Sequence, residues 1–166
     1  MRILKSLLVA TILLIGAHTM HAQDYNSAIG LRLGYPLSVS YKQFLGGGSN
    51  AIEAFAGFRS FSGYSWFNVG ALYQVHKPIE GVEGLNWYFG GGASVFFWNF
   101  DNSFVFGDED DSSLSIGILG NLGLDYKFAD APVNVSLDWV PAFFVNGYGS
   151  GFGGGYGALS VRYVLK

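Results

Sequence analysis

Charged side chains in this chain alternate with apolar ones, as in Val161-Arg162-Tyr163 near its end. Neighbouring residues of a β-strand point to opposite faces, so this spacing gathers charges behind an apolar surface. A buried charge is costly unless it is paired, and we therefore predict an interior ionic network. Its expected members are Arg32, Lys42, Glu53, Arg59, Asp125, Lys127, Asp138 and Arg162.

Two expected pairings follow from the turns. A turn at 46–50 places Lys42 nearly opposite Glu53, and the last two strands bring Arg162 near Ser136 and Asp138. A gated ion path is the alternative use of such a network. Large side chains with the same inward parity favour a filled interior, and these are Phe55, Leu72, Tyr88, Phe96 and Trp98.

His76 is the one histidine outside the N-terminal segment, and it is the candidate for catalysis. A lipid-modifying enzyme of this size would be expected to use a Ser-His-acid set, with its histidine facing the lipid or the rim. His76 has inward parity beside Gln74. The sequence therefore favours a hydrogen-bonded structural histidine, and we predict no catalytic residues.

The acidic cluster Asp108, Glu109, Asp110 and Asp111 is a candidate weak site for a divalent cation or for a cation that bridges lipopolysaccharide. It lacks the ligand spacing of an EF-hand loop, which favours a solvated loop. The glycine runs at 90–92 and 149–155 precede no helix, so nucleotide binding is not expected. We predict no cofactor and no resident metal.

These side chains are positioned by eight predicted strands, most of them long enough to cross a bilayer at a tilt. The turns at 46–50, 80–84 and 129–132 are expected on the periplasmic side, and the longer connections 101–113 and 146–154 on the outside. The predicted strands are 27–35, 37–44, 51–61, 66–77, 85–100, 114–128, 133–144 and 155–166.

Aromatic residues recur near the predicted strand ends, where girdles form at membrane interfaces. Ordinary core aromatics are the alternative. The residues are Tyr41, Tyr73, Trp87, Trp98, Tyr126, Trp139 and Tyr163.

The composition suits an exported barrel. Residues 1–22 predict a cleaved secretory signal, with Arg2 and Lys5 before an apolar run too short to span a membrane, which leaves 23–166 as one barrel domain. The chain has no Cys, 25 Gly and 13% charged residues. No basic patch indicates nucleic acid as a partner.

The signal, the even strand count and the closing strand at 155–166 together resemble the small eight-stranded bacterial outer-membrane barrels, typified by outer membrane protein A's transmembrane domain and outer membrane protein X. The resemblance implies insertion by the barrel-assembly machinery and contact with outer-membrane lipid and lipopolysaccharide.

We therefore predict an all-β, eight-stranded antiparallel up-and-down transmembrane β-barrel in the cell outer membrane. Its expected role is structural or surface-interacting and non-enzymatic. Two alternatives stay open, namely a membrane-embedded lipid-modifying enzyme and a secreted lipocalin-like barrel that binds an apolar ligand with its faces inverted.

Overall fold

The computed structural model describes residues 25–100, 112–146, 150–153 and 156–165, and all regular structure in these ranges is β. The predicted signal segment 1–22 lies outside them. The strands are β1 (Ser27–Tyr35), β2 (Leu37–Phe44), β3 (Asn50–Phe61), β4 (Tyr64–Pro78), β5 (Leu85–Phe100), β6 (Ser112–Lys127), β7 (Val133–Trp139), β8 (Ala142–Phe144), β9 (Gly151–Gly153) and β10 (Gly157–Leu165).

The strands close into a ring of eight. Each of β1 to β6 pairs antiparallel with the next strand, β7 pairs with β10, and β10 returns to β1 over its whole length, from Ser27↔Leu165 to Tyr35↔Gly157. Each of the eight strands in the ring has a hydrogen-bonded neighbour on both sides, so the closed part of the barrel has no free edge. The predicted eight-stranded antiparallel barrel is confirmed.

Several strand ends differ from the prediction by one or two residues, and two larger differences concern the segments 133–144 and 146–154. The expected strand 133–144 is divided into β7 and β8 at Val140 and Pro141, because proline has no N–H to donate to a ladder. The short strand β9 lies within the expected loop 146–154 and pairs with β8. The pair β8–β9 therefore extends the sheet beyond the closed ring.

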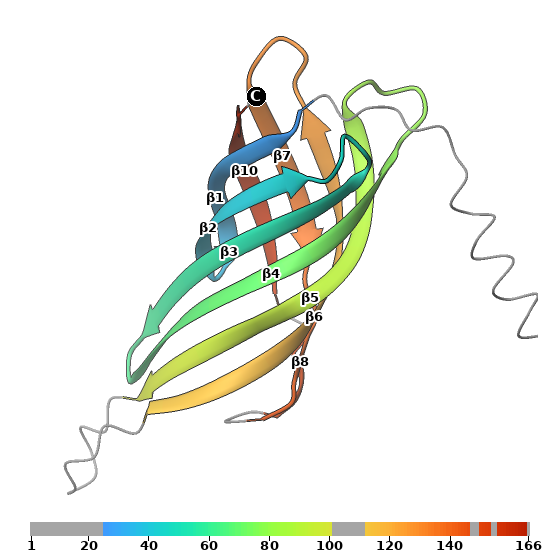
Figure 1. Cartoon of the computed structure of the whole chain (residues 1–166). Coiled ribbons are helices and arrows are strands. Elements are labelled where there is room, and N and C mark those ends of the chain that lie inside the picture. Colours follow the sequence, from blue (N-terminus) through green and yellow to red (C-terminus); the bar gives the residue numbers. More distant parts are fainter. Residues whose placement is uncertain (1–24, 101–111, 147–149, 154–155, 166) are drawn as a thin grey trace, which may run out of the picture.

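The barrel has a terminal end, where β1 starts and β10 ends, and a far end opposite to it (Figure 1). The connections 45–49, 79–84 and 128–132 lie at the terminal end. At the far end, β1 and β2 are joined at the cis Tyr35–Pro36 bond, whereas β3 and β4 continue to a two-residue turn in which Gly63 has a φ of 97°. A left-handed φ of this kind suits glycine.

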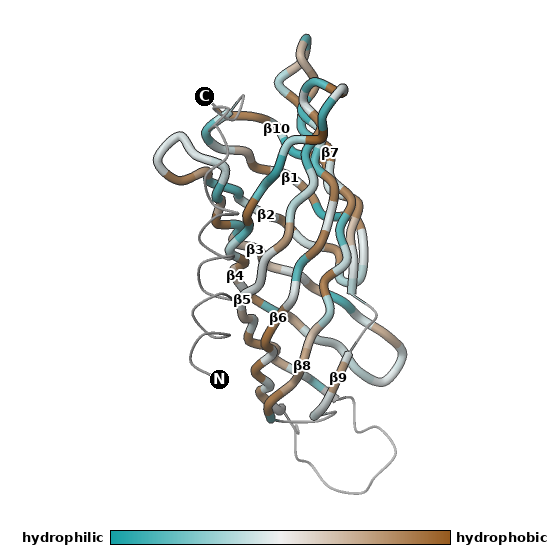
Figure 2. The backbone as a smooth tube through the Cα atoms, turned by 90° about the vertical axis from the view of Figure 1, so that its right-hand side faces the viewer, coloured by the Kyte–Doolittle hydropathy of each residue, from teal (hydrophilic) through white to brown (hydrophobic). Residues whose placement is uncertain are grey.

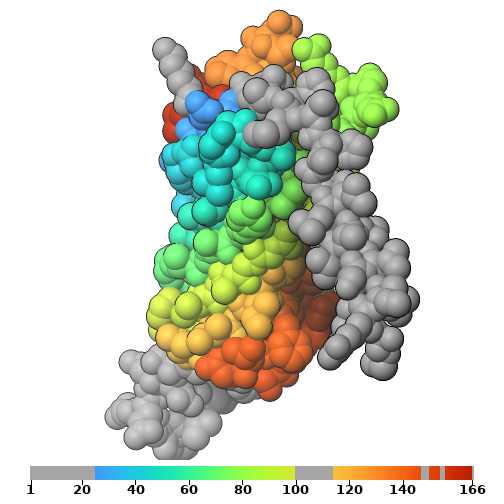
Figure 3. Space-filling view, turned by 45° about the vertical axis from the view of Figure 1, so that its right-hand side comes forward, coloured from blue at the N-terminus to red at the C-terminus, as the bar shows by residue number. Residues whose placement is uncertain are grey.

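The walls of the barrel differ in length. The strands β1, β2 and β10, here called the short wall, have 9, 8 and 9 residues. The strands β3 to β6, here called the long wall, have 12 to 16 residues and run farther toward the far end (Figure 1). In Figure 3 the strands from β2 to β6 follow one another down one face of the molecule.

Apolar and polar residues alternate along the strands (Figure 2), and the apolar ones point outward. Ile29, Leu31 and Leu33 are each about half exposed, while Arg32 between them is buried. No helix among the described residues is long and apolar enough to cross a membrane.

The barrel interior has three layers. A small apolar cluster closes the terminal end, and it contains Tyr25, Ala28, Phe44 and Ala51. A larger one fills the far half, and it contains Trp66, Leu72, Phe96, Leu119, Val140, Ala142 and Phe144. Six of the eight predicted ionic residues lie between these two clusters.

Candidate functional site: the polar layer inside the barrel

Six of the eight predicted network residues are buried together inside the barrel. They come from β1, β2, β3, β6, β7 and β10, one from each strand. Each occupies a position of its strand whose side chain points into the barrel. The three cations balance the three anions, so the layer is electrically neutral. These six are Arg32, Lys42, Arg162, Glu53, Asp125 and Asp138.

Glu53 is held by two guanidinium groups. Its Oε1 lies 2.5 Å from Arg162 Nη2 and 3.0 Å from Arg32 Nη1. Its Oε2 accepts a hydrogen bond from Gln74 Nε2 at 2.8 Å, so both carboxylate oxygens have partners. Arg162 also donates to Ser136 Oγ at 2.7 Å and to Ser40 Oγ at 3.2 Å.

Asp125 occupies the part of the layer nearest the terminal end. It accepts hydrogen bonds from Lys42 Nζ at 3.0 Å, Asn134 Nδ2 at 2.7 Å and the Tyr25 hydroxyl at 3.4 Å. Tyr25 precedes β1, and burial, with the Asp125 carboxylate nearby, raises its pKa well above the ordinary value for tyrosine. The neutral phenol therefore serves as a stable donor at this end.

Asp138 joins the layer to the far half of the barrel. Its Oδ2 lies 3.0 Å from Arg32 Nη2 and accepts a hydrogen bond from the Tyr88 hydroxyl at 3.0 Å. Its Oδ1 accepts from the backbone N–H of Ala158 at 3.2 Å. Arg32 therefore links Asp138 to Glu53 across the lumen.

The expected pairings are partly rearranged. Lys42 and Glu53 are register partners, as the turn predicted, but the ammonium group of Lys42 pairs with Asp125. Arg162 meets Ser136 as expected, but its carboxylate partner is Glu53, and Asp138 pairs with Arg32. Long side chains in so narrow a barrel reach across the lumen, which strand register alone does not reveal.

Arg59 and Lys127 make other contacts. The Arg59 guanidinium is half-buried at the far end, 3.8 Å from the ring centre of Tyr35 and 4.3 Å from that of Phe61. Lys127 donates to the backbone carbonyls of Phe128 and Ala131 in the connection after β6. Both residues lie outside the six-charge layer.

His76 is fully buried near the terminal end. Its ring stacks on Tyr88 with centroids 4.7 Å apart, and its Nε2 lies 3.3 Å from Gln74 Oε1. In the part of the chain that the structure describes, no serine or carboxylate is hydrogen-bonded to it. This arrangement is not that of a Ser-His-acid set, which needs both neighbours.

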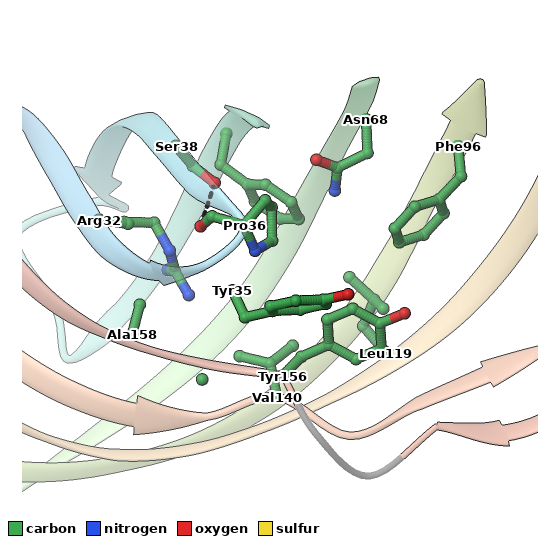
Figure 4. Close-up of a pocket in the computed structure, with 12 residues that line it drawn as sticks. Arg32, Tyr35, Pro36, Ser38, Asn68, Phe96, Leu119, Val140, Tyr156 and Ala158 are labelled. Carbon is green, nitrogen blue, oxygen red and sulfur yellow. Dashed lines mark hydrogen bonds between the residues drawn. The ribbon is translucent and has the colours of Figure 1, made fainter. Parts of the chain in front are cut away.

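A small pocket lies in the far half of the barrel, between Arg32 and the aromatic residues (Figure 4). Its volume of about 30 Å³ has room for about two water molecules. Asn68 lines it, and the amide oxygen of this buried side chain has no hydrogen-bond partner among the described residues. Water can supply the missing donor there.

The acidic cluster Asp108, Glu109, Asp110 and Asp111 lies outside the described residues. Within the described ranges, no group of three or more His, Asp or Glu side chains is placed to hold a metal ion.

Sequence reasoning missed Tyr25, which precedes the first strand and therefore has no strand parity to indicate its direction. The neutral members Gln74, Asn121 and Asn134 share the inward parity of the charges, and this signal identifies them as interior residues.

The fold is similar to the solved structure described as "Crystal structure of Neisserial surface protein A (NspA)", with a TM-score of 0.54. The two share 15% sequence identity, and the match covers 84% of this chain and 93% of that one. No family model and no curated protein matches the sequence. At this identity the likeness extends to the barrel fold alone.

Proposed function

We propose that this chain spans the cell outer membrane as a closed barrel, exported by its N-terminal signal and inserted by the barrel-assembly machinery. Its role is structural or surface-interacting and non-enzymatic, and its outer face contacts lipid and lipopolysaccharide.

One observation carries this proposal: the barrel buries six charged side chains and exposes large apolar side chains on the outside of each of its strands. Lys42, Glu53 and Asp125 have no exposed surface, while Leu137 and Val161 on the outside are 60% and 43% exposed. Such an outer face is unfavourable in water over so many strands, and lipid is the solvent that suits it. A lipocalin-like barrel would place the apolar residues inside and Arg162 in water, so this arrangement argues against that alternative.

The size of the apolar face supports the same proposal. On β6 the outward apolar residues run from Leu114 to Leu124. Ten residues of a tilted strand rise about 25 Å, which is the height of the apolar band of outer-membrane barrels. The half-exposed aromatics Tyr41, Trp87 and Tyr163 lie toward the terminal end of this face, as an interfacial girdle requires.

The filled lumen supports a role without steady conduction. Glu53, Arg32 and Arg162 bridge the interior, and the Trp66–Phe96 cluster fills the half beyond them. Eight strands leave an interior about as wide as the side chains that fill it.

The experiment that tests the proposal is fractionation followed by electrophoresis. The protein should follow the outer membrane, and its gel mobility in dodecyl sulfate should shift on boiling, because a closed barrel resists unfolding until heated. The variant Val161→Arg serves as a control, since a charge in the lipid-facing surface should reduce the heat-shifted form. Recovery of the wild-type chain in the soluble periplasmic fraction, with one unshifted band, would reject the proposal.

A further inference from the structure

Three inward glycines lie between polar side chains that hydrogen-bond to each other across the glycine. In each case the two polar residues are the register partners of the glycine on the neighbouring strands, and the bonds measure 2.9 to 3.2 Å. Because glycine has no side chain, its neighbours can meet above it. These crossings are Arg162 to Ser40 over Gly30, Gln74 to Asn121 over Gly90, and Tyr88 to Asp138 over Gly123.

Gly57 is flanked in the same way, but the side chains beside it do not bond to each other. Its register partners are Ser38 on β2 and Asn68 on β4. Ser38 Oγ donates to the Pro36 carbonyl at 3.2 Å, and the amide nitrogen of Asn68 donates to Ser94 Oγ at 3.1 Å. The amide oxygen of Asn68, a residue that is 2% exposed, has no hydrogen-bond partner among the described residues. The crossing over Gly57 therefore stays open.

The space over Gly57 is narrow and lined by two acceptors. A methyl group on Gly57 would lie 2.5 Å from Ser38 Oγ and 2.6 Å from Asn68 Oδ1, so both oxygens border the same small space. In Figure 4 the Asn68 oxygen points toward Ser38 and Pro36. Since the hydroxyl hydrogen of Ser38 is directed at Pro36, both oxygens can accept there. A molecule that donates two hydrogen bonds would serve both.

Arg32 supplies an unpaired donor on the other side of the same pocket. It is the register partner of Ser38 on β1, and it lines the pocket together with Ser38 and Asn68. Its Nη1 lies 3.0 Å from Glu53 Oε1, yet it makes no hydrogen bond within the described ranges. One register line across β1 to β4 thus holds four inward positions, and these are Arg32, Ser38, Gly57 and Asn68. The two small residues in the middle leave the gap between the two long ones.

Water suits this gap in size and in hydrogen bonding. The pocket volume of about 30 Å³ has room for about two molecules. An apolar guest would leave the Arg32 donor and the Asn68 acceptor unpaired in a buried space, which is unfavourable. The Arg32 guanidinium repels a cation, and an added anion would upset a layer whose three cations already balance three anions. Buried water makes two to four hydrogen bonds, and so it can serve both groups.

We propose that this pocket is a binding site for two water molecules that link Arg32 to Asn68. The first water accepts a hydrogen bond from Arg32 Nη1 and donates to the second, which donates to Asn68 Oδ1 and Ser38 Oγ. From Asn68 the chain continues through Ser94 Oγ to the carbonyl oxygen of Val69. The two waters thereby extend the ionic layer to β4 and β5 in the far half of the barrel.

Magnetisation transfer from water to side-chain amide protons tests the proposal. The deuterated, ¹⁵N-labelled protein is folded in detergent micelles, so the result does not depend on where the protein resides in the cell. Nuclear Overhauser and rotating-frame transfer of opposite sign identify a bound water and exclude proton exchange. Asn121 is the internal control, because its amide oxygen accepts from Gln74 over Gly90 and needs no water.

We expect a bound-water signal at the side-chain amide of Asn68 and none at that of Asn121. Ser38→Thr should abolish the Asn68 signal, because it keeps the hydroxyl and its added methyl group takes the space of about one water molecule. The same change at the exposed Ser60 on the outer face of β3 should preserve the signal.

A wild-type protein without the Asn68 signal, or with an equal signal at Asn121, would overturn the proposal. A signal that survives Ser38→Thr would overturn it as well. The wild-type comparison needs no variant, so it decides the question even where Ser38→Thr does not fold.

Discussion

Arg162 and Glu53 stand 109 positions apart in the sequence, and their side chains meet in the barrel interior with Nη2 and Oε1 2.5 Å apart. Glu53 keeps Arg32 as a second partner, and Arg32 in turn keeps Asp138. The pair is therefore one link in a neutral chain of charges rather than an isolated salt bridge.

Replacing Arg162 by Leu should destabilise the barrel by about 3–5 kcal/mol, because it leaves an excess negative charge in a buried layer. Adding Glu53→Gln should recover much of this loss, since the remaining two cations and two anions again balance. Urea unfolding from lipid vesicles measures both values. Tolerance of Arg162→Leu by itself would contradict the buried network.

A variant at Val161, next to Arg162, tests the outer face of the barrel instead of its interior. Val161 points outward and is 43% exposed, so Val161→Arg places a charge against lipid at a cost of about 2–4 kcal/mol near the midplane. Glu53→Gln should give no rescue here, because the new charge lies on the other face of β10. Folding yields into vesicles, measured for the single and the double variants, compare the two faces directly.

Lys42 and Asp125 form a second link, and both side chains are fully buried. Lys42→Met or Asp125→Asn should each cost about 3–5 kcal/mol, because each strands the other charge. The double variant should cost less than the sum of the two, with a coupling energy of about 1–3 kcal/mol. A double-mutant cycle by urea unfolding measures this, and strict additivity would show that the two charges do not interact.

The interior layers also predict little conductance. In planar bilayers the folded protein should give no large, steady single-channel currents, because charged and aromatic side chains fill a lumen of eight strands. A sixteen-stranded porin in the same bilayers is the positive control. Stable open channels of comparable size would favour the ion path that the sequence left open.

Strand alternation predicted most of the fold. Arg32, Lys42 and Asp138 were each predicted to point into the lumen, and they do. The prediction works because side chains alternate between the two faces of a strand whatever the strand packs against. The strand break at Val140–Pro141 was also signalled by proline, although the prediction did not use it.

The sequence did not predict which charged side chains pair with one another inside the lumen. Lys42 lies beside Glu53 in register yet bonds to Asp125, whose strand is on another part of the ring. Which side chains meet across the barrel depends on the stagger of its strands and on its diameter. The alternation of residues along a strand gives neither of these quantities. The unequal walls, by contrast, were already present in the predicted bounds, since the strands at 27–35 and 37–44 have 9 and 8 residues and the strand at 85–100 has 16.

Gly57 offers a test of how closely the far half is filled. It lies on β3 and points inward, and a methyl group added there would come within 2.5 Å of Ser38 Oγ and 2.6 Å of both Asn68 Oδ1 and Pro36 Cγ. Pro36 cannot withdraw easily, because its ring is fixed to the backbone at the turn between β1 and β2. Gly57→Ala should therefore cost about 1–3 kcal/mol through overpacking, even though alanine suits a strand better than glycine does.

The matched control is Ala56→Gly on the neighbouring outward position, which crowds nothing and should cost at most about 1 kcal/mol. Urea unfolding from vesicles compares the stability of the two variants. A Gly57→Ala variant as stable as the wild type would show that the residues around Gly57 can move to make room for the added methyl group.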